Sequence, residues 1–257
     1  MQVRRAYLIF VLVALASTNL VVFKTVLSPQ VLTVSVLDVG QGDAILIQSP
    51  TGTTMLIDGG RGRAVLRELG ETLPFWERSI DAVLATHPDA DHIGGLPDVF
   101  QNYAVGAVIE SGVRSDTGPS RALLEAIDAE PGLVRVIAKR GMRLELGGGA
   151  YADILYPDRD VSNVATNDGS IVMRLVYGTT SFLFTGDLAS NIEEWLLVLD
   201  AENGMLDADV LKIGHHGSKH SISAEWLTAV SPTNAVISVG KENSHGQQTA
   251  LHQTRSQ

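Results

Sequence analysis

The sequence predicts an α/β fold of two packed β-sheets with helices on their outer faces, preceded by one N-terminal transmembrane helix. Three observations support this prediction. Short runs rich in β-branched residues recur along most of the 257-residue chain. Helical patterns are interspersed with these runs in both halves of the chain. An uncharged apolar run at residues 6–23 comes before the first strand-like run.

The N-terminal segment is the clearest shift in composition. Arg4 and Arg5 precede the uncharged run, and Lys24 follows it. Because positive residues mark the cytoplasmic side of a membrane segment, residues 1–27 are predicted to be a single-pass anchor or signal segment. Residues 28–257 then form the folded domain, on the outer side of the cytoplasmic membrane. Ala14-Leu15-Ala16 resembles a signal-peptidase site, so secretion after cleavage is the alternative.

Composition and charge exclude several classes of protein. With 45% apolar residues, the chain is too hydrophobic for a disordered tail and long enough to bury a core. The absence of cysteine excludes disulfides, cysteine-based zinc sites and thiol catalysis. A net charge of −10 disfavours nucleic-acid binding through the overall field. Any contact with DNA would therefore need a local basic patch or bridging metal ions.

The expected elements follow from hydrophobic pattern and turn residues. Turns rich in Gly and Pro, such as 40–42 and 50–52, separate the first strands. Strands are predicted at runs of β-branched and apolar residues: 31–37, 44–47, 53–57, 80–85, 105–109, 134–138, 143–146, 152–156, 170–176, 181–184, 208–213 and 235–239. Helices are predicted at 64–73, 121–129, 192–199 and 224–230.

Four potential metal ligands follow the predicted strand 80–85. They are His87, Asp89, Asp91 and His92, on a loop in which a proline at position 88 disfavours a helix. Imidazole and carboxylate groups are the ligands of zinc, manganese and iron sites. For a single residue, a solvated polar loop would be the better interpretation, but four within six positions favour a metal site.

Further ligand types follow other predicted strands. Asp187 comes after the strand 181–184, and the adjacent His215 and His216 come after the strand 208–213. Neighbouring side chains on an extended chain point in opposite directions, so at most one of these two histidines is expected to bind a metal directly. Three more aspartates lie on early loops, namely Asp38, Asp43 and Asp58. Because buried carboxylates are costly without a cation, these loops together predict one shared, cation-filled cleft.

Five motifs in this order resemble the metallo-β-lactamase superfamily. They are LDVGQGDA, IDGG, THPDADHIGG, FTGD and KIGHHGS, and the likeness extends over about residues 31–240. Within that superfamily the chain looks most like the C-terminal domain of ComEC-type DNA-uptake proteins. The resemblance implies an αββα sandwich with a two-metal site at one edge of the sheets.

The resemblance also implies the roles of the residues. The metal ligands would be His87, Asp89, Asp91, His92, Asp187 and His215, with Asp89 at a position where the superfamily has histidine. Asp187 would hold both ions and Asp91 would orient the attacking water, so these two are the expected catalytic residues. Further ligands or supporting groups would be Asn167, Asp168, His216, Asp38, Asp43 and Asp58. Contacts with a substrate phosphate would come from Lys212, Ser218, Lys219 and His220, for which an exposed loop is the alternative.

These assignments predict a metal-dependent hydrolase. Oxygen ligands favour two Mn²⁺ ions, with Zn²⁺ as the alternative. The expected reaction is phosphodiester hydrolysis of DNA in competence-type uptake, with membrane contact through residues 6–23 and a separate DNA-channel protein as partner. Two alternatives stay open. One is a two-metal hydrolase of a lactone, thioester or β-lactam, and the other is a non-catalytic, truncated relative.

Overall fold

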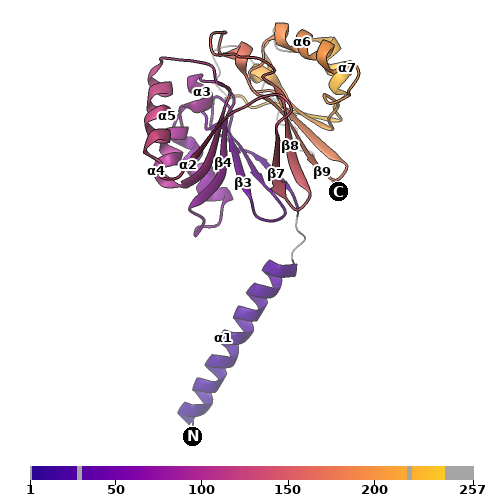
Figure 1. Cartoon of the computed structure of the whole chain (residues 1–257). Helices are drawn as coiled ribbons and strands as arrows, with labels where there is room; N and C mark the ends of the chain where they lie inside the picture. The colour runs from indigo at the N-terminus through magenta and orange to yellow at the C-terminus, as the bar shows by residue number, and fades with distance from the viewer. Residues whose placement is uncertain (1, 28–30, 219–221, 241–257) are drawn as a thin grey trace. The chain divides into compact units, whose positions relative to one another are not determined.

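The chain divides into two compact units, residues 1–31 and residues 32–257. The computed structural model describes residues 2–27, 31–218 and 222–240. In the first unit, α1 (Gln2–Leu27) is one continuous helix (Figure 1). Across the described residues, no helix has the combined length and apolar character that crossing a bilayer requires. The structure therefore gives no support to the predicted transmembrane segment at 6–23.

The second unit contains two six-stranded sheets, with strand orders β1-β2-β3-β4-β5-β6 and β12-β11-β10-β9-β8-β7. The first sheet consists of β1 (Thr33–Val36), β2 (Ile45–Gln48), β3 (Thr54–Ile57), β4 (Ser79–Ala85), β5 (Ala104–Glu110) and β6 (Val134–Ile137). The second consists of β7 (Arg143–Gly147), β8 (Ala150–Tyr156), β9 (Val172–Tyr177), β10 (Thr180–Phe184), β11 (Val210–Lys212) and β12 (Asn234–Val236). Each predicted strand overlaps an observed one.

Helices cover the outer face of each sheet (Figure 1). The first sheet is covered by α2 (Ala64–Thr72), α4 (Leu96–Asn102) and α5 (Gly118–Ala129), whose buried side chains share one apolar cluster with that sheet. The second sheet is covered by α6 (Ser190–Asp200) and α7 (Ala224–Val230) in the same way. The layers are therefore helix, sheet, sheet and helix, which confirms the predicted αββα sandwich.

Strand periodicity explains this layering. In β2, Ile45 and Ile47 belong to the apolar cluster between the two sheets, whereas Leu46 belongs to the cluster under the helices. Alternate side chains of a strand point to opposite faces, so both faces of the sheet are buried and the strand reads as a continuous apolar run. A shift of one residue in register would exchange the two clusters, and the pairing of β2 with its neighbours is correspondingly well specified.

Strand direction positions the site. In the first sheet β3, β4, β5 and β6 are parallel, and in the second β10, β11 and β12 are parallel. Parallel neighbours end at the same edge of their sheet, and the polar motifs of this sequence come directly after β3, β4, β10 and β11. Each sheet therefore delivers its polar motifs to one edge.

The segment after β4 differs from the prediction. It is not a loop throughout, because α3 (Ala90–Ile93) begins two residues after Pro88 and carries Asp91 and His92. The next helix, α4, was also missed. Its Pro97 lies in the first turn, where a proline is tolerated because the backbone N–H has no helical partner there.

Candidate metal centre

His92 lies at the centre of a buried polar cluster. It comes from α3 and has no exposed surface. Its Nδ1 is 2.7 Å from Asp58 Oδ2, and its Nε2 is 3.3 Å from Asp187 Oδ1. A carboxylate can only accept a hydrogen bond, so Nδ1 donates and the Nε2 lone pair of the neutral ring faces the cluster.

His87 is held in the same sense through Thr86. The backbone N–H and hydroxyl of Thr86 donate to the two carboxylate oxygens of Asp58, at 2.8 and 2.7 Å. The lone pairs of the Thr86 hydroxyl then face His87 Nδ1 at 3.0 Å, and the hydroxyl accepts a hydrogen bond from the Nδ1–H group. The His87 and His92 ring centroids lie 4.1 Å apart. Asp58, fully buried after β3, thus orients two imidazoles; the sequence analysis did not single out Thr86, although it lies within the THPDADHIGG motif.

The second sheet supplies Asp187 and His216. Asp187 follows β10, and its backbone N–H donates to Ser170 Oγ at 3.1 Å. His216 lies in the short turn η2 (Gly214–Gly217), where its Nδ1 donates to the carbonyl oxygen of Ser238 at 2.9 Å. Its Nε2 is 3.5 Å from both Asp91 Oδ2 and Asp187 Oδ2. The supporting serines 170 and 238 carried no signal in the sequence that distinguished them from other polar residues.

His216 occupies the place that the sequence analysis gave to His215. Both residues have left-handed backbone conformations, with φ of +46° for His215 and +51° for His216. The argument from an extended chain therefore does not apply, and the two rings lie at 83° with centroids 6.5 Å apart. Among the described residues, His215 belongs to none of the groups of three converging donor atoms, whereas His216 belongs to two of them.

The other predicted ligands are distributed around this cluster. Asp91 joins it through His216, and Asp89 lies at its rim with Oδ2 3.5 Å from His87 Nε2. Asn167 contributes a buried side-chain oxygen without a hydrogen-bond partner among the described residues. Asp168 is half-buried, and its backbone carbonyl accepts a hydrogen bond from the Tyr156 hydroxyl at 2.7 Å. Asp38 is exposed and accepts from a nearby backbone N–H, so the structure does not bring it to the cluster.

Among the described residues, the buried polar atoms that lack a hydrogen-bond partner are Asp43 Oδ1, His87 Nε2, His92 Nε2, Asn167 Oδ1, Asp187 Oδ1 and His216 Nε2. All of them except Asn167 Oδ1 belong to residues of the converging donor groups. Leaving one buried polar atom unpaired costs about 1–3 kcal/mol, so several together indicate an occupant. Two groups of donors, His87-His92-Asp187 and Asp91-His92-His216, each lie within 4.8 Å of one another. Imidazole and carboxylate donors at this separation fit divalent metal ions.

The ionisable side chains of the cluster shift one another's pKa values. His216, whose Nε2 lies 3.5 Å from Asp91 Oδ2, lowers the pKa of Asp91 to about 2, against the effect of burial. Burial raises the pKa of Asp187, but the histidines around it, His92 above all, bring that pKa well below the ordinary range. Burial lowers the pKa of His92, but Asp187 and Asp58 bring it well above its ordinary value. Without metal, the cluster therefore holds protonated imidazole against ionised carboxylates.

These shifts predict an unusual pH dependence of stability for the metal-free protein. His92, with its pKa raised above 6.5, stabilises the fold fully below pH 6.5, and this contribution is lost as the pH rises through the raised pKa. Asp187, with its pKa lowered below 3.8, stabilises the fold above pH 3.8, and this contribution is lost as the pH falls through the lowered pKa. In chelator, the melting temperature is therefore expected to be highest between pH 3.8 and pH 6.5, where both contributions are fully present.

Saturating Mn²⁺ or Zn²⁺ should reverse the alkaline side of this profile, because metal binding requires neutral imidazole and displaces its proton. Melting temperatures measured across the pH range in chelator and in excess ion provide the check. A profile that falls toward high pH equally in both conditions would contradict a metal site at His92.

Gly42 packs against the backbone of Asp91 and is required there. Its φ is +99°, and a Cβ atom at this position would lie 1.7 Å from the Asp91 carbonyl oxygen. Gly42→Ala is expected to lower the free energy of unfolding by about 1–3 kcal/mol in chemical denaturation. Gly52→Ala is the matched control, because Gly52 also has a positive φ, +91°, but a Cβ there meets nothing within 4 Å. Equal losses in the two variants would contradict the predicted clash.

The residues predicted to contact a substrate phosphate differ in their exposure. Lys212 is 2% exposed, with Nζ 2.7 Å from Asp43 Oδ2 and donating to the Ile213 carbonyl oxygen at 2.9 Å. The structure thus places it inside the fold, where it neutralises a buried carboxylate and does not face substrate. Ser218 is half-buried directly after η2, while Lys219 and His220 lie outside the described residues.

Comparison with known proteins shows the family of the chain that carries this cluster. Residues 37–241 match the family model of the metallo-beta-lactamase superfamily. The chain belongs to this superfamily. It is 31% identical to ComE operon protein 3 of Bacillus subtilis over 228 residues, which cover 82% of this chain and 28% of that protein. It is also 31% identical to competence protein ComA of Neisseria gonorrhoeae, over 86% of this chain and 29% of that one. The chain spans less than a third of the length of these relatives.

Solved structures share the fold of this metallo-β-lactamase superfamily member. The metallo-β-lactamase fold protein YhfI from Bacillus subtilis superimposes with a TM-score of 0.51 at 17% identity, covering 84% of this chain and 89% of that one. CmlA, a diiron β-hydroxylase from Streptomyces venezuelae, gives a TM-score of 0.51 at 16% identity, covering 79% of this chain and 44% of that one. The fold, the likeness to competence proteins and the donor cluster identify a metal-dependent hydrolase of this superfamily.

Proposed function

We propose that this chain is a two-metal phosphodiesterase that cleaves DNA during competence-type DNA uptake. The observation that carries the proposal is the convergence of unpaired donor atoms from both sheets on Asp187. Its Oδ1 lies 3.3 Å from His92 Nε2 and its Oδ2 lies 3.5 Å from His216 Nε2. Asp187 also belongs to two groups of converging donors, one that contains His87 and one that contains His216, as a carboxylate shared between two ions would.

The ligand sets follow from this geometry. His87, with Asp89 Oδ2 3.5 Å from its Nε2, would hold one ion together with Asp187, and the unpaired Oδ1 of Asn167 is a candidate further ligand. A second set would hold the other ion, and its members are Asp91, His92, Asp187 and His216. Oxygen donors are numerous in both sets, which supports Mn²⁺ with Zn²⁺ as the alternative.

The chain's own residues would prepare the reaction. When bound, a pair of divalent ions acidifies a water molecule and stabilises the attacking and leaving oxygens of an in-line displacement. Asp91, ionised at neutral pH because its pKa is about 2, can accept a hydrogen bond from the attacking water. Asp58 and Thr86 keep both imidazole Nε2 atoms facing the cluster. The competence relatives support DNA as the substrate, and they are the reason for proposing delivery by a separate channel protein at the outer face of the membrane.

A cleavage assay tests the proposal. The full chain is incubated with an end-labelled oligonucleotide in chelator, Mg²⁺, Mn²⁺ or Zn²⁺. Cleavage is expected with Mn²⁺ above the level with Zn²⁺, and it should be lost in Asp187→Asn. Asp38→Asn is the matched control, because it removes the same charge from an exposed residue outside the cluster.

Two outcomes would overturn the proposal. Absence of cleavage with every ion, in folded and ion-loaded protein, would exclude the nuclease and call for lactone, thioester and β-lactam substrates in the same panel. Cleavage that survives Asp187→Asn unchanged would show that the activity does not come from this site.

A further inference from the structure

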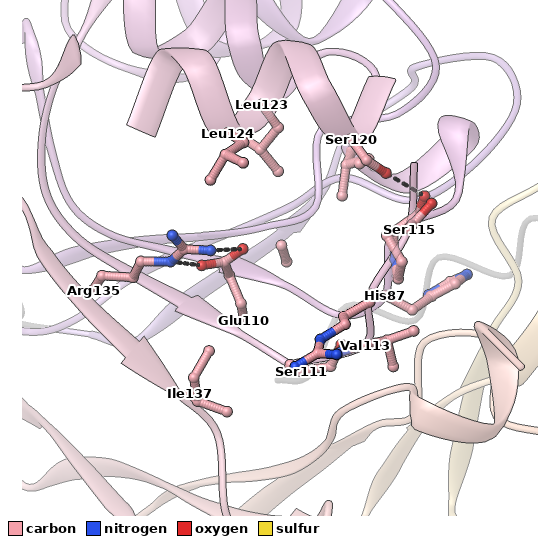
Figure 2. A pocket seen from close by; sticks show the side chains of 15 residues that line it. His87, Glu110, Ser111, Val113, Ser115, Ser120, Leu123, Leu124, Arg135 and Ile137 are labelled. Carbon is pink, nitrogen blue, oxygen red and sulfur yellow. Dashed lines mark hydrogen bonds and ion pairs between the residues drawn. The ribbon is translucent and has the colours of Figure 1, made fainter. Parts of the chain in front are cut away.

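A cavity of about 350 Å³ opens beside the donor cluster, with His87 in its wall (Figure 2). Its walls come from the segment after β4, from β5 and the loop that follows it, and from α5 and β6. His87 belongs both to this wall and to the donor cluster. If one group of a substrate is bound at the donor cluster, the next group of the same substrate would therefore lie at the mouth of the cavity.

Two facing sides of the cavity are apolar. Figure 2 shows Leu123 and Leu124 pointing into it from α5, and Ile137 pointing toward them from β6. Leu124 and Ile137 are each 42% exposed, so a flat apolar group inserted between them would remove their surface from water. The binding free energy gained in this way is proportional to the apolar area that a ligand covers.

The remaining lining is polar and includes Arg114, whose positive charge also acts on the exposed carboxylate of Asp160. Arg135 is paired with Glu110, with Nη2 3.3 Å from Oε1 (Figure 2). Arg114 is exposed, and within the described part of the chain its guanidinium forms no ion pair or hydrogen bond. Ser111 and Ser115 also line this side. In a chain with net charge −10, an exposed guanidinium on the wall of this cavity is suited to a phosphate.

We infer that this cavity binds one unstacked nucleotide of a single DNA strand, next to the phosphodiester held at the donor cluster. The inference rests on the proposed function and adds a substrate preference to it. The base packs between Leu124 and Ile137, and its phosphate contacts Arg114. A base within a duplex is stacked between its neighbours and paired with one base of the other strand, and bringing it into the cavity costs that stacking and pairing. Single strands and frayed ends are therefore the preferred substrates.

Binding in chelator tests the cavity without any cleavage. Fluorescence anisotropy is measured with the full chain, a short fluorescein-labelled oligo-dT strand, and a blunt duplex of the same length. The single strand is expected to bind at least about tenfold more tightly than the duplex. Arg114→Gln should weaken single-strand binding by about tenfold. Arg78→Gln is its matched control, because Arg78 is also exposed and lies before β4, away from the cavity.

A second pair of variants tests the apolar wall. Leu124→Glu places a carboxylate in the cavity and should weaken single-strand binding by about tenfold or more. Leu227→Glu makes the same change on α7, at a leucine that is 41% exposed and outside the cavity, and should leave binding unchanged. Absence of saturable single-strand binding, equal binding of strand and duplex, or equal effects within either pair would each overturn the inference.

Cleavage separates this inference from the proposed function. Binding that depends on Arg114, without cleavage by any ion, would leave the cavity's role intact and refute the nuclease. Cleavage that depends on Asp187 but not on Arg114 or strandedness would leave the nuclease intact and refute the role of the cavity.

Discussion

Lys212→Met is expected to lower the free energy of unfolding of the metal-free protein by about 3–5 kcal/mol. Lys212 and Asp43 are 2% exposed each, and their side chains meet at 2.7 Å. Removing the ammonium group takes the nearer of two positive groups from the buried Asp43 carboxylate and leaves His216, whose Nδ1 is 3.6 Å from Asp43 Oδ1. The penalty for a buried charge that loses its nearer partner exceeds the loss of packing, because methionine keeps most of the volume of the lysine stem. Equilibrium urea unfolding in chelator measures the loss.

A double variant separates charge from packing. Because removing both partners leaves neither charge of this pair unpaired, Asp43→Asn combined with Lys212→Met should recover much of the lost stability. Lys139→Met is the matched control at an exposed lysine and should stay within about 0.5 kcal/mol of the wild type. A loss below 1 kcal/mol in Lys212→Met would show that the ion pair is not needed to hold the cluster.

The location of the site could be predicted from the sequence because of strand direction. Polar motifs follow apolar strands at Asp58, His87 and Asp187, and these strands belong to the parallel parts of two sheets. Parallel strands end at a common edge, so motifs far apart in the sequence converge without any knowledge of loop structure. The sequence analysis predicted one shared cleft from the cost of burying carboxylates without a cation, and His87, His92 and Asp187 do meet.

Local backbone conformation and long-range pairing could not be predicted in this way. The turn at His215 and His216 has positive φ angles at both residues, which no pattern in the sequence indicates for histidine. Lys212 looked like an exposed contact beside the site because its partner Asp43 lies in a distant motif. Residues that act through a neighbour, such as Thr86, are distinguished only by the atoms they touch.

Asp58→Asn should weaken binding of Mn²⁺ or Zn²⁺ by about 10- to 100-fold. Asp58 accepts the Nδ1 proton of His92 at 2.7 Å and two hydrogen bonds from Thr86. The Oδ1 of an asparagine can accept from the Thr86 backbone, but its NH₂ group then faces His92 Nδ1. This favours the tautomer with the proton on Nε2, and a protonated Nε2 cannot bind a metal ion.

Calorimetric titration of the metal-free protein measures this loss, with Asp38→Asn as a control that removes the same charge from an exposed loop. Nitrogen chemical shifts of His92 distinguish the proposed cause from a general loss of structure, since only a change of tautomer moves the proton from Nδ1 to Nε2. Because Thr86 links Asp58 to His87, the substitution acts on both imidazoles from one position. Metal affinity equal to that of Asp38→Asn, with the His92 shifts unchanged, would show that Asp58 does not orient the ligands.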